Sequence, residues 1–223
     1  MSKEQQKIYI IPLNLVLFPH GSTQIHVTEK SLIESVQHCY KNNQPIGVTL
    51  IREQKQGSST LYEPYLIGTA SKINSLEEDS KGNIMIQISG EKRFRIRKFE
   101  ENTESIAAII EFLEDDEVEN TPMLDALTYK AQEVFKEYVD NMLSETELNI
   151  DIFYPKDATT LSFMIASLLP FDNKQKQKML EMTDSIERIR ELVKHLVHQS
   201  KEAEHSKIYK LDSKQLKDWI YYN

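Results

Sequence analysis

The spacing of apolar residues changes near residue 115, and this change limits the fold of the chain more than any other sequence feature. Up to that point apolar residues come in short runs separated by turn residues, which is typical of β-strands. The runs predicted as strands span residues 8–17, 46–51, 65–73, 84–88, 93–99 and 106–113. From residue 121 onward apolar residues recur every three or four positions, which indicates amphipathic helices. The sequence therefore predicts an α+β protein, with a β-rich part followed by an α-helical bundle.

The expected organisation is a β-rich domain over residues 1–115, a helical bundle over residues 121–203 and a tail over residues 204–223. The acidic run Glu114–Glu117 joins the first two, and we interpret it as a solvated linker. The tail is rich in aromatic residues, whereas disordered ends are usually poor in them. We therefore predict that the tail forms a short docked helix, packed either onto its own bundle or onto another chain, including a second copy.

Local signals mark several turns and helix ends. Thr28 is predicted to cap a helix whose apolar face includes Cys39. Residues 79–83 (DSKGN) predict a hairpin turn, because glycine and asparagine tolerate positive φ. In the helical part, Asp172 and Asp184 are each followed three residues later by a glutamine or glutamate. This is the spacing of a capping box, so each aspartate is predicted to begin a helix.

Sequence motifs for catalysis are missing. No glycine is followed by lysine, which argues against a phosphate-binding P-loop, and the six glycines are too scattered for a dinucleotide fingerprint. No serine lies in a G-x-S-x-G elbow. A single sequence leaves a Ser–Lys dyad open, but nothing in this one supports it. Cys39 is expected to be a buried, inert thiol. We therefore predict a protein that is not an enzyme, with no catalytic residue and no cofactor.

Composition restricts the compartment and the metal sites. Cys39 is the only cysteine, which rules out an intrachain disulfide and a cysteine-based zinc site, and fits a cytoplasmic protein. His195 and His198 are three residues apart, but no H-E-x-x-H spacing or acidic partner accompanies them, so no metal site is predicted. The apolar run 8–18 lacks a signal-peptide cleavage site, and no run approaches the roughly 18 residues that span a bilayer.

One sequence feature, a basic strand, favours nucleic-acid binding. Arg93, Arg95 and Arg97 alternate with apolar residues, so on a strand they would project to one face. RNA binding by this face is the alternative function. The opposing interpretation is that the arginines pair with nearby acids such as Glu100 and Glu101. The formal net charge of -8 disfavours binding to a phosphate backbone and favours the second interpretation.

An ordered series of motifs resembles the amino-terminal, substrate-binding domain of the Lon protease family, the ATP-dependent protease La domain. The motifs are residues 11–21 (IPLNLVLFPHG), 44–51 (QPIGVTLI), 66–70 (LIGTA), 88–96 (ISGEKRFRI) and 161–170 (LSFMIASLLP). Each motif is weak alone, but together they cover about residues 8–200 in the order and spacing of the family.

The resemblance implies a six-stranded, mostly antiparallel PUA-like β pseudobarrel followed by a helical bundle. It also implies a stand-alone module without the ATPase and peptidase domains of the full protease. Its partners would be exposed apolar segments of unfolded or tagged proteins, or, as an adaptor, the Lon protease itself. From position and family shape, substrate contacts are predicted at Phe18, Pro19 and His20 in the first turn and at Glu29 and Lys30 at the start of the first helix. PUA-like barrels also serve RNA, so the arginine strand remains the alternative.

Two segments depart from the family pattern. Residues 27–32 (VTEKSL) differ from the form common in small stand-alone members, so a ligand contact made there by the family's arginine and tyrosine is not expected. The tail after about residue 204 has no counterpart in the family.

Overall fold

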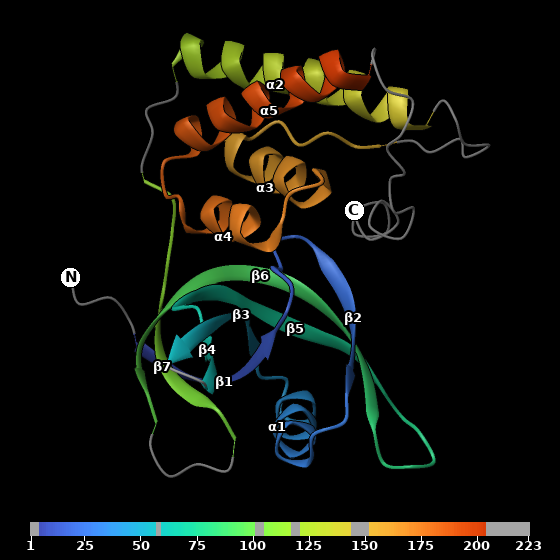
Figure 1. Ribbon diagram of the computed structural model, residues 1–223, viewed down its shortest axis with the longest axis vertical. Helices are drawn as coiled ribbons and strands as arrows, with labels where there is room; N and C mark the ends of the chain where they lie inside the picture. Colours follow the sequence, from blue (N-terminus) through green and yellow to red (C-terminus); the bar gives the residue numbers. More distant parts are fainter. Residues whose placement is uncertain (1–4, 57–58, 101–104, 117–120, 144–151, 204–223) are drawn as a thin grey trace. The chain divides into compact units, whose positions relative to one another are not determined.

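The computed structural model describes residues 5–56, 59–100, 105–116, 121–143 and 152–203 (Figure 1). The predicted tail helix at 204–223 lies outside these residues. Contacts between Cα atoms divide the chain into two compact units. The first comprises residues 1–114 with 171–181, and the second comprises residues 115–170 with 182–223.

The first unit is a ring of β-strands. Its strands are β1 (Gln5–Leu13), β2 (Ser22–Val27), β3 (Ile46–Gln56), β4 (Ser59–Pro64), β5 (Ile67–Glu78), β6 (Ile84–Phe99) and β7 (Ala107–Phe112). Strands β1, β7, β6, β5 and β3 pair in that order, and β3 pairs again with β1, which closes the ring. The β1–β3 pairing is parallel, and the other pairings are antiparallel. The predicted mostly antiparallel architecture is confirmed.

The strands differ from the predicted runs in their bounds and in their number. β6 joins the runs 84–88 and 93–99 into one 16-residue strand, because Gly90 lies inside the strand and does not end it. The pairing of β5 with β6 shifts register opposite Glu91, which is a β-bulge. β2 and β4 are additional strands that their few apolar residues did not predict.

The hairpin turn predicted at residues 79–83 is confirmed. The Asp79 Oδ1 atom accepts hydrogen bonds from the backbone amides of Lys81 at 2.8 Å and Asn83 at 2.9 Å. Gly82 has φ of 81°, a conformation that most side chains disfavour. The pKa of Asp79 is lowered chiefly by a hydrogen bond between its side chain and the Asn83 side chain. The two backbone bonds lower it further.

Helix α1 (Lys30–Lys41) covers one side of the strand ring (Figure 1). Val36 and Cys39 on α1 join a buried cluster with Ile84, Ile86 and other apolar residues of the strands. A second buried cluster draws on β1, β5, β6 and β7. The residue at the start of α1 is Glu29, without a side-chain cap, so the predicted cap at Thr28 is wrong.

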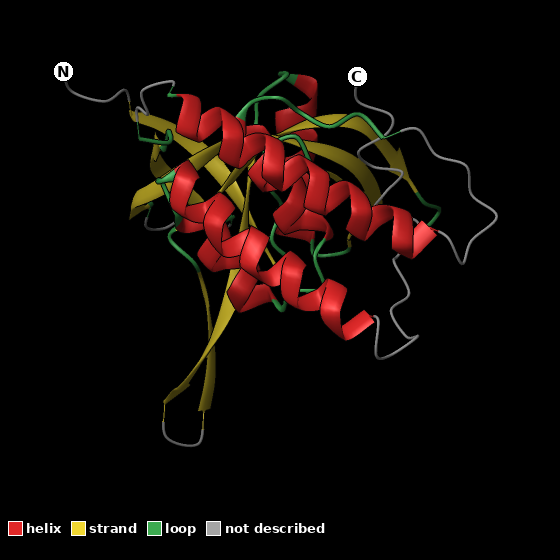
Figure 2. Cartoon of the chain, turned by 90° about the horizontal axis from the view of Figure 1, so that it is seen from above, coloured by secondary structure: helices red, strands yellow, loops and turns green. Residues whose placement is uncertain are grey.

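The four remaining helices are α2 (Pro122–Leu143), α3 (Ala158–Leu168), α4 (Asn173–Glu181) and α5 (Ser185–Ala203). Helices α2 and α5 pack side by side in the second unit (Figure 2). The predicted capping box before α4 is present, since Gln175 N donates to Asp172 Oδ1 at 2.7 Å and Asp172 N donates to Gln175 Oε1 at 3.1 Å. At α5, Glu187 N donates to Asp184 Oδ1 at 3.0 Å. Among the described helices, none has the length and apolar character needed to cross a bilayer.

Helix α4 belongs to the first unit, which differs from the predicted continuous bundle over residues 121–203. Two buried polar side chains explain the difference. Arg93 donates from Nη1 to the Leu180 carbonyl at 2.7 Å, and Gln177 donates from Nε2 to the Ile67 carbonyl at 3.0 Å. These bonds connect α4 to strands that lie 87 and 110 residues away in sequence, and helical periodicity carries no sign of them.

Asp115 and Asp116 of the acidic run belong to the second unit, and the interpretation of the run as a solvated linker is wrong at Asp115. Asp115 forms an ion pair with Arg188 on α5, whose side chain is fully buried. The Arg188 Nε atom also donates to Ser162 Oγ at 2.7 Å, and its guanidinium lies 4.1 Å from the centroid of the Phe163 ring. Thr159 Oγ1 donates to Asp115 Oδ2 at 2.8 Å. The ion pair therefore connects the segment to both α3 and α5.

Candidate functional site

The first predicted contact group lies in the turn between β1 and β2. Phe18 and Pro19 are buried there, with Phe18 only 1% exposed, while His20 is exposed. The His20 backbone amide donates to the Gly90 carbonyl at 2.9 Å, and the Gly90 amide donates to the Gly21 carbonyl at 2.8 Å. These backbone bonds hold the turn against β6. His20 is the one predicted contact in this turn that is open to a partner.

The second predicted contact group, Glu29 and Lys30, is exposed at the start of α1. Glu29 accepts a hydrogen bond from Ser31 Oγ at 2.9 Å. The six residues of β2 separate this group from the first turn, a length of about 20 Å at the usual rise per strand residue. The structure therefore does not bring the two predicted groups into one site.

The predicted basic face of β6 is wrong at Arg93. Its side chain is 3% exposed because it reaches the end of α4. Arg97 is exposed but pairs with Glu111 on β7, with 2.6 Å between Nε and Oε2. Pairing with an acid was the opposing interpretation, although the partner is neither Glu100 nor Glu101. Arg95 is exposed, but Arg93 is buried and Arg97 is paired, so the three arginines do not form a continuous basic surface.

An apolar groove of about 390 Å³ lies where the β3–β4 hairpin joins the ring. It is lined by Arg52, Glu63, Pro64, Leu66, Phe99 and Ile106. Leu66 is 49% exposed and Ile106 is 37% exposed. Half-exposed aliphatic side chains that share one groove are a feature of surfaces that bind apolar partners.

The backbone around the groove is held firmly while the apolar side chains face outward. The Leu66 carbonyl accepts from Ile96 N at 2.7 Å, and the Ile106 carbonyl accepts from Ile10 N at 2.8 Å. Both carbonyls are bonded to ring strands, so the backbone that carries Leu66 and Ile106 is fixed to the ring. The groove is therefore a preformed surface.

Polar side chains and a strand edge border the groove. Arg52 Nη2 lies 3.0 Å from Glu63 Oε2, and the Arg52 guanidinium lies 5.8 Å from the centroid of the Tyr65 ring. Residues 51–56 of β3 pair with β4 alone, so this hairpin extends from the ring (Figure 2). Among the described strands, β4 has no partner on its other edge. An unpaired edge can accept an extended chain through backbone hydrogen bonds.

Sequence reasoning did not find this groove. Leu66 and Ile106 each adjoin an apolar run, and an exposed aliphatic residue has the same sequence signature as a buried one. The one local signal is Pro64, which ends β4 beside the groove.

Cys39 is buried, as the sequence predicts, and burial raises the pKa of its thiol to about 11. A raised pKa keeps the thiol neutral until the pH approaches that value, so the nucleophilic thiolate is scarce. At pH 9 we expect iodoacetamide to label the folded protein about 50-fold more slowly than the urea-unfolded protein. Equal rates, measured by mass spectrometry, would contradict a buried thiol.

Within the described residues, no group of three histidine, cysteine, aspartate or glutamate side chains is placed to hold a metal ion.

Comparisons with known proteins agree on one family. The chain is 26% identical over 192 residues to a Lon protease of Treponema pallidum and 29% identical over 201 residues to one of Amoebophilus asiaticus. These alignments cover 84% and 87% of this chain but only 21% and 24% of the relatives. The chain therefore spans about a quarter or less of the length of these relatives.

Solved structures show the same fold. A Lon N-terminal domain protein from Xanthomonas campestris superposes with a TM-score of 0.60 at 20% identity, covering 84% of this chain and 97% of that one. The N-terminal domain of a Mycobacterium avium complex Lon protease gives 0.59 at 19% identity, covering 86% and 98%. The family model of the ATP-dependent protease La (LON) substrate-binding domain matches residues 7–198. The chain therefore belongs to the Lon substrate-binding domain family.

Proposed function

We propose that this chain is a non-catalytic recognition module that binds exposed apolar segments of other protein chains in the groove between Leu66 and Ile106. The observation that carries the proposal is the presence of two half-exposed aliphatic side chains on a fixed backbone, beside an unpaired strand edge. Membership of a substrate-binding domain family supports protein segments as the ligand.

Binding in this groove would combine two physical terms. Each client side chain that becomes fully buried contributes about 1.5–3 kcal/mol from apolar burial, less the entropy lost when the client segment is ordered. Backbone pairing with β4 would align the client without reading its sequence, because main-chain hydrogen bonds are common to all segments. The result would be weak, sequence-tolerant binding, which suits a protein that samples unfolded chains.

The names of the relatives suggest a partner as well as a substrate. Both relatives are Lon proteases, and this chain aligns with a quarter or less of each. We therefore include in the proposal that the chain presents bound segments to a protease of this type. The chain would supply recognition, and the protease would cut the peptide bond.

Replacing both Leu66 and Ile106 with serine is expected to weaken binding to an unfolded, apolar polypeptide by about tenfold or more, because burial of two aliphatic side chains is lost. Fluorescence anisotropy with a labelled, permanently unfolded polypeptide measures the dissociation constant. Met85→Ser is the matched control, since Met85 is 39% exposed but does not line the groove. Its dissociation constant should equal that of the unaltered chain.

Two results would contradict the proposal. The first is an unchanged dissociation constant in the Leu66→Ser, Ile106→Ser variant while its thermal unfolding is also unchanged. The second is cleavage of the labelled polypeptide. When it is incubated with the pure protein, with and without ATP, we expect it to stay intact on a gel. Cleavage by the pure protein would show that the chain is an enzyme.

A further inference from the structure

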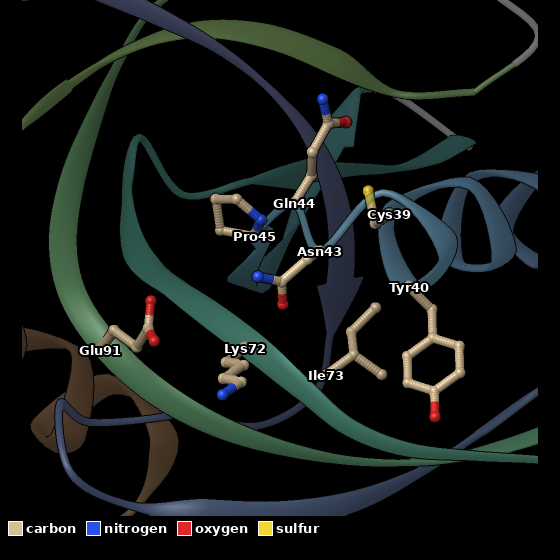
Figure 3. A pocket seen from close by; sticks show the side chains of 8 residues that line it. All are labelled: Cys39, Tyr40, Asn43, Gln44, Pro45, Lys72, Ile73 and Glu91. Carbon is tan, nitrogen blue, oxygen red and sulfur yellow. The ribbon is translucent and has the colours of Figure 1, made fainter.

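A second, polar cavity of about 310 Å³ opens beside the end of α1, away from the apolar groove. Figure 3 shows its lining side chains, which are Cys39, Tyr40, Asn43, Gln44, Pro45, Lys72, Ile73 and Glu91. None of these residues lines the groove described above. The cavity is therefore a separate site, and a ligand of its own would be independent of the proposed function.

Glu91 is placed toward this cavity by an irregularity in the strand. It lies at the bulge of β6, where Gly90 pairs with Ser71 and Lys92 pairs with Ala70, so Glu91 has no direct partner on β5. Bulges change the direction in which a side chain points, and they are common beside functional sites. The Lys92 ammonium lies 5.7 Å from the centroid of the Phe112 ring, and among the described residues it forms no ion pair with Glu91.

Four exposed polar side chains of the cavity have no partner among the described residues. No hydrogen bond or ion pair is made by the side chains of Tyr40, Asn43, Lys72 or Glu91 in the part of the chain that the structure describes. In Figure 3 the Asn43 amide lies on the side of Lys72 and Glu91, whereas the Gln44 side chain points away from them. A carboxylate, an ammonium and an amide thus face one small space without satisfying one another.

The end of α1 adds negative potential to this space. Gln44 N donates to the Cys39 carbonyl at 2.9 Å, and Asn43, with φ of 50°, donates from its amide to the Tyr40 carbonyl at 3.3 Å. This Schellman arrangement fixes the loop that carries Asn43. The carboxyl end of a helix carries partial negative charge and favours a bound cation. The helix end and the Glu91 carboxylate both favour a cationic group.

We propose that this cavity binds the free amino-terminal residue of a polypeptide. The protonated α-amino group would donate hydrogen bonds to the Glu91 carboxylate, and Lys72 would donate to the carbonyl oxygen of the first peptide bond. The Asn43 amide, which both donates and accepts, complements the following peptide group. The exposed Tyr40 ring, beside the largely buried Ile73, supplies a small apolar contact for the first side chain. A free carboxyl terminus fits less well, because it would meet Glu91 and the negative end of α1.

The test is a titration of the full chain with each of three short peptides. Binding is measured from changes in amide chemical shifts in two-dimensional NMR spectra. The peptides are Leu-Ala-Ala-amide, its amino-acetylated form, and acetyl-Leu-Ala-Ala with a free carboxylate. We expect the first to bind and to shift amides near residues 40–45, 72 and 91. Acetylation should weaken binding by about tenfold or more, because it removes the charge-assisted hydrogen bond.

Variants separate this site from general surface binding. Glu91→Gln should weaken binding of Leu-Ala-Ala-amide by about tenfold or more, and Glu77→Gln, an exposed β5 control outside the cavity, should leave it unchanged. Both glutamates are exposed, so neither change is expected to unfold the chain, which thermal unfolding verifies. The proposal is overturned if the acetylated peptide binds equally well, if the free carboxylate is the group recognised, or if no shift appears at about 10 mM peptide.

Discussion

Replacing Asp115 with alanine is expected to lower the free energy of unfolding of the second unit by about 3–5 kcal/mol. The change leaves the Arg188 guanidinium, which is fully buried, without its only ion-pair partner among the described residues. Arg188 would keep hydrogen bonds to Ser162 Oγ and to the Met182 carbonyl, but neither carries a charge. An uncompensated buried charge is among the few single changes that destabilise a protein this strongly.

The measurement is urea unfolding followed by circular dichroism, with hydrogen exchange of the α3 and α5 amides to assign the loss to this unit. Asp116→Ala is the control, because Asp116 is exposed and its carboxylate accepts a hydrogen bond from the neutral Thr183 hydroxyl at 2.9 Å. It should cost about 1 kcal/mol or less. Adding Arg188→Met to the Asp115→Ala variant should recover part of the loss, since the buried charge is then removed. If Asp115→Ala and Asp116→Ala destabilise the chain equally, the ion pair does not have the assigned role.

Gly90→Ala is expected to destabilise the first unit by about 3 kcal/mol. A Cβ atom at Gly90 would overlap the Phe18 carbonyl oxygen and lie 3.0 Å from Thr69 Cγ2. The overlap involves backbone, which cannot move aside without breaking the His20–Gly90 and Gly90–Gly21 hydrogen bonds. The turn that holds Phe18 in the core would therefore separate from β6.

The change in midpoint of thermal unfolding measures this effect, and Gly82→Asn is the matched control. Gly82 also has an unusual backbone, with φ of 81°, but a Cβ atom there meets nothing within 4 Å. Asparagine tolerates that conformation, so the control should cost less than about 1 kcal/mol. If both variants lose a similar amount of stability, the close approach of Gly90 to the first turn does not explain the glycine at this position.

Periodicity predicted much of the fold because burial in a strand or a helix follows a regular spacing. The α+β architecture, the 79–83 turn and the capping of α4 all depend on neighbouring residues, so local sequence contains them. The misplaced α4 shows where local sequence fails. Its place in the first unit depends on Arg93 and Gln177 bonding to backbone carbonyls far along the chain, and such bonds leave no periodic trace.

The site was harder to predict than the fold. Position in the family pattern indicated the first turn, yet burial of Phe18 and Pro19 shows that apolar residues in a turn can serve the core. Conversely, Leu66 resembles any strand residue, and its exposure arises only where the hairpin departs from the ring. The same holds for charge at Asp115, because an acidic run gives no sign that one member has a buried arginine opposite it.

The most direct test of the proposed recognition groove is photo-crosslinking from single positions of the full chain to an unfolded, apolar polypeptide. A photoreactive amino acid is placed in turn at the positions of Leu66, Ile106, His20, Lys30 and Met85, and crosslinks are mapped by mass spectrometry. We predict crosslinks from positions 66 and 106 that exceed those from the other three by about tenfold. Equal crosslinking from all five positions, or crosslinks concentrated at positions 20 and 30, would contradict recognition in the groove.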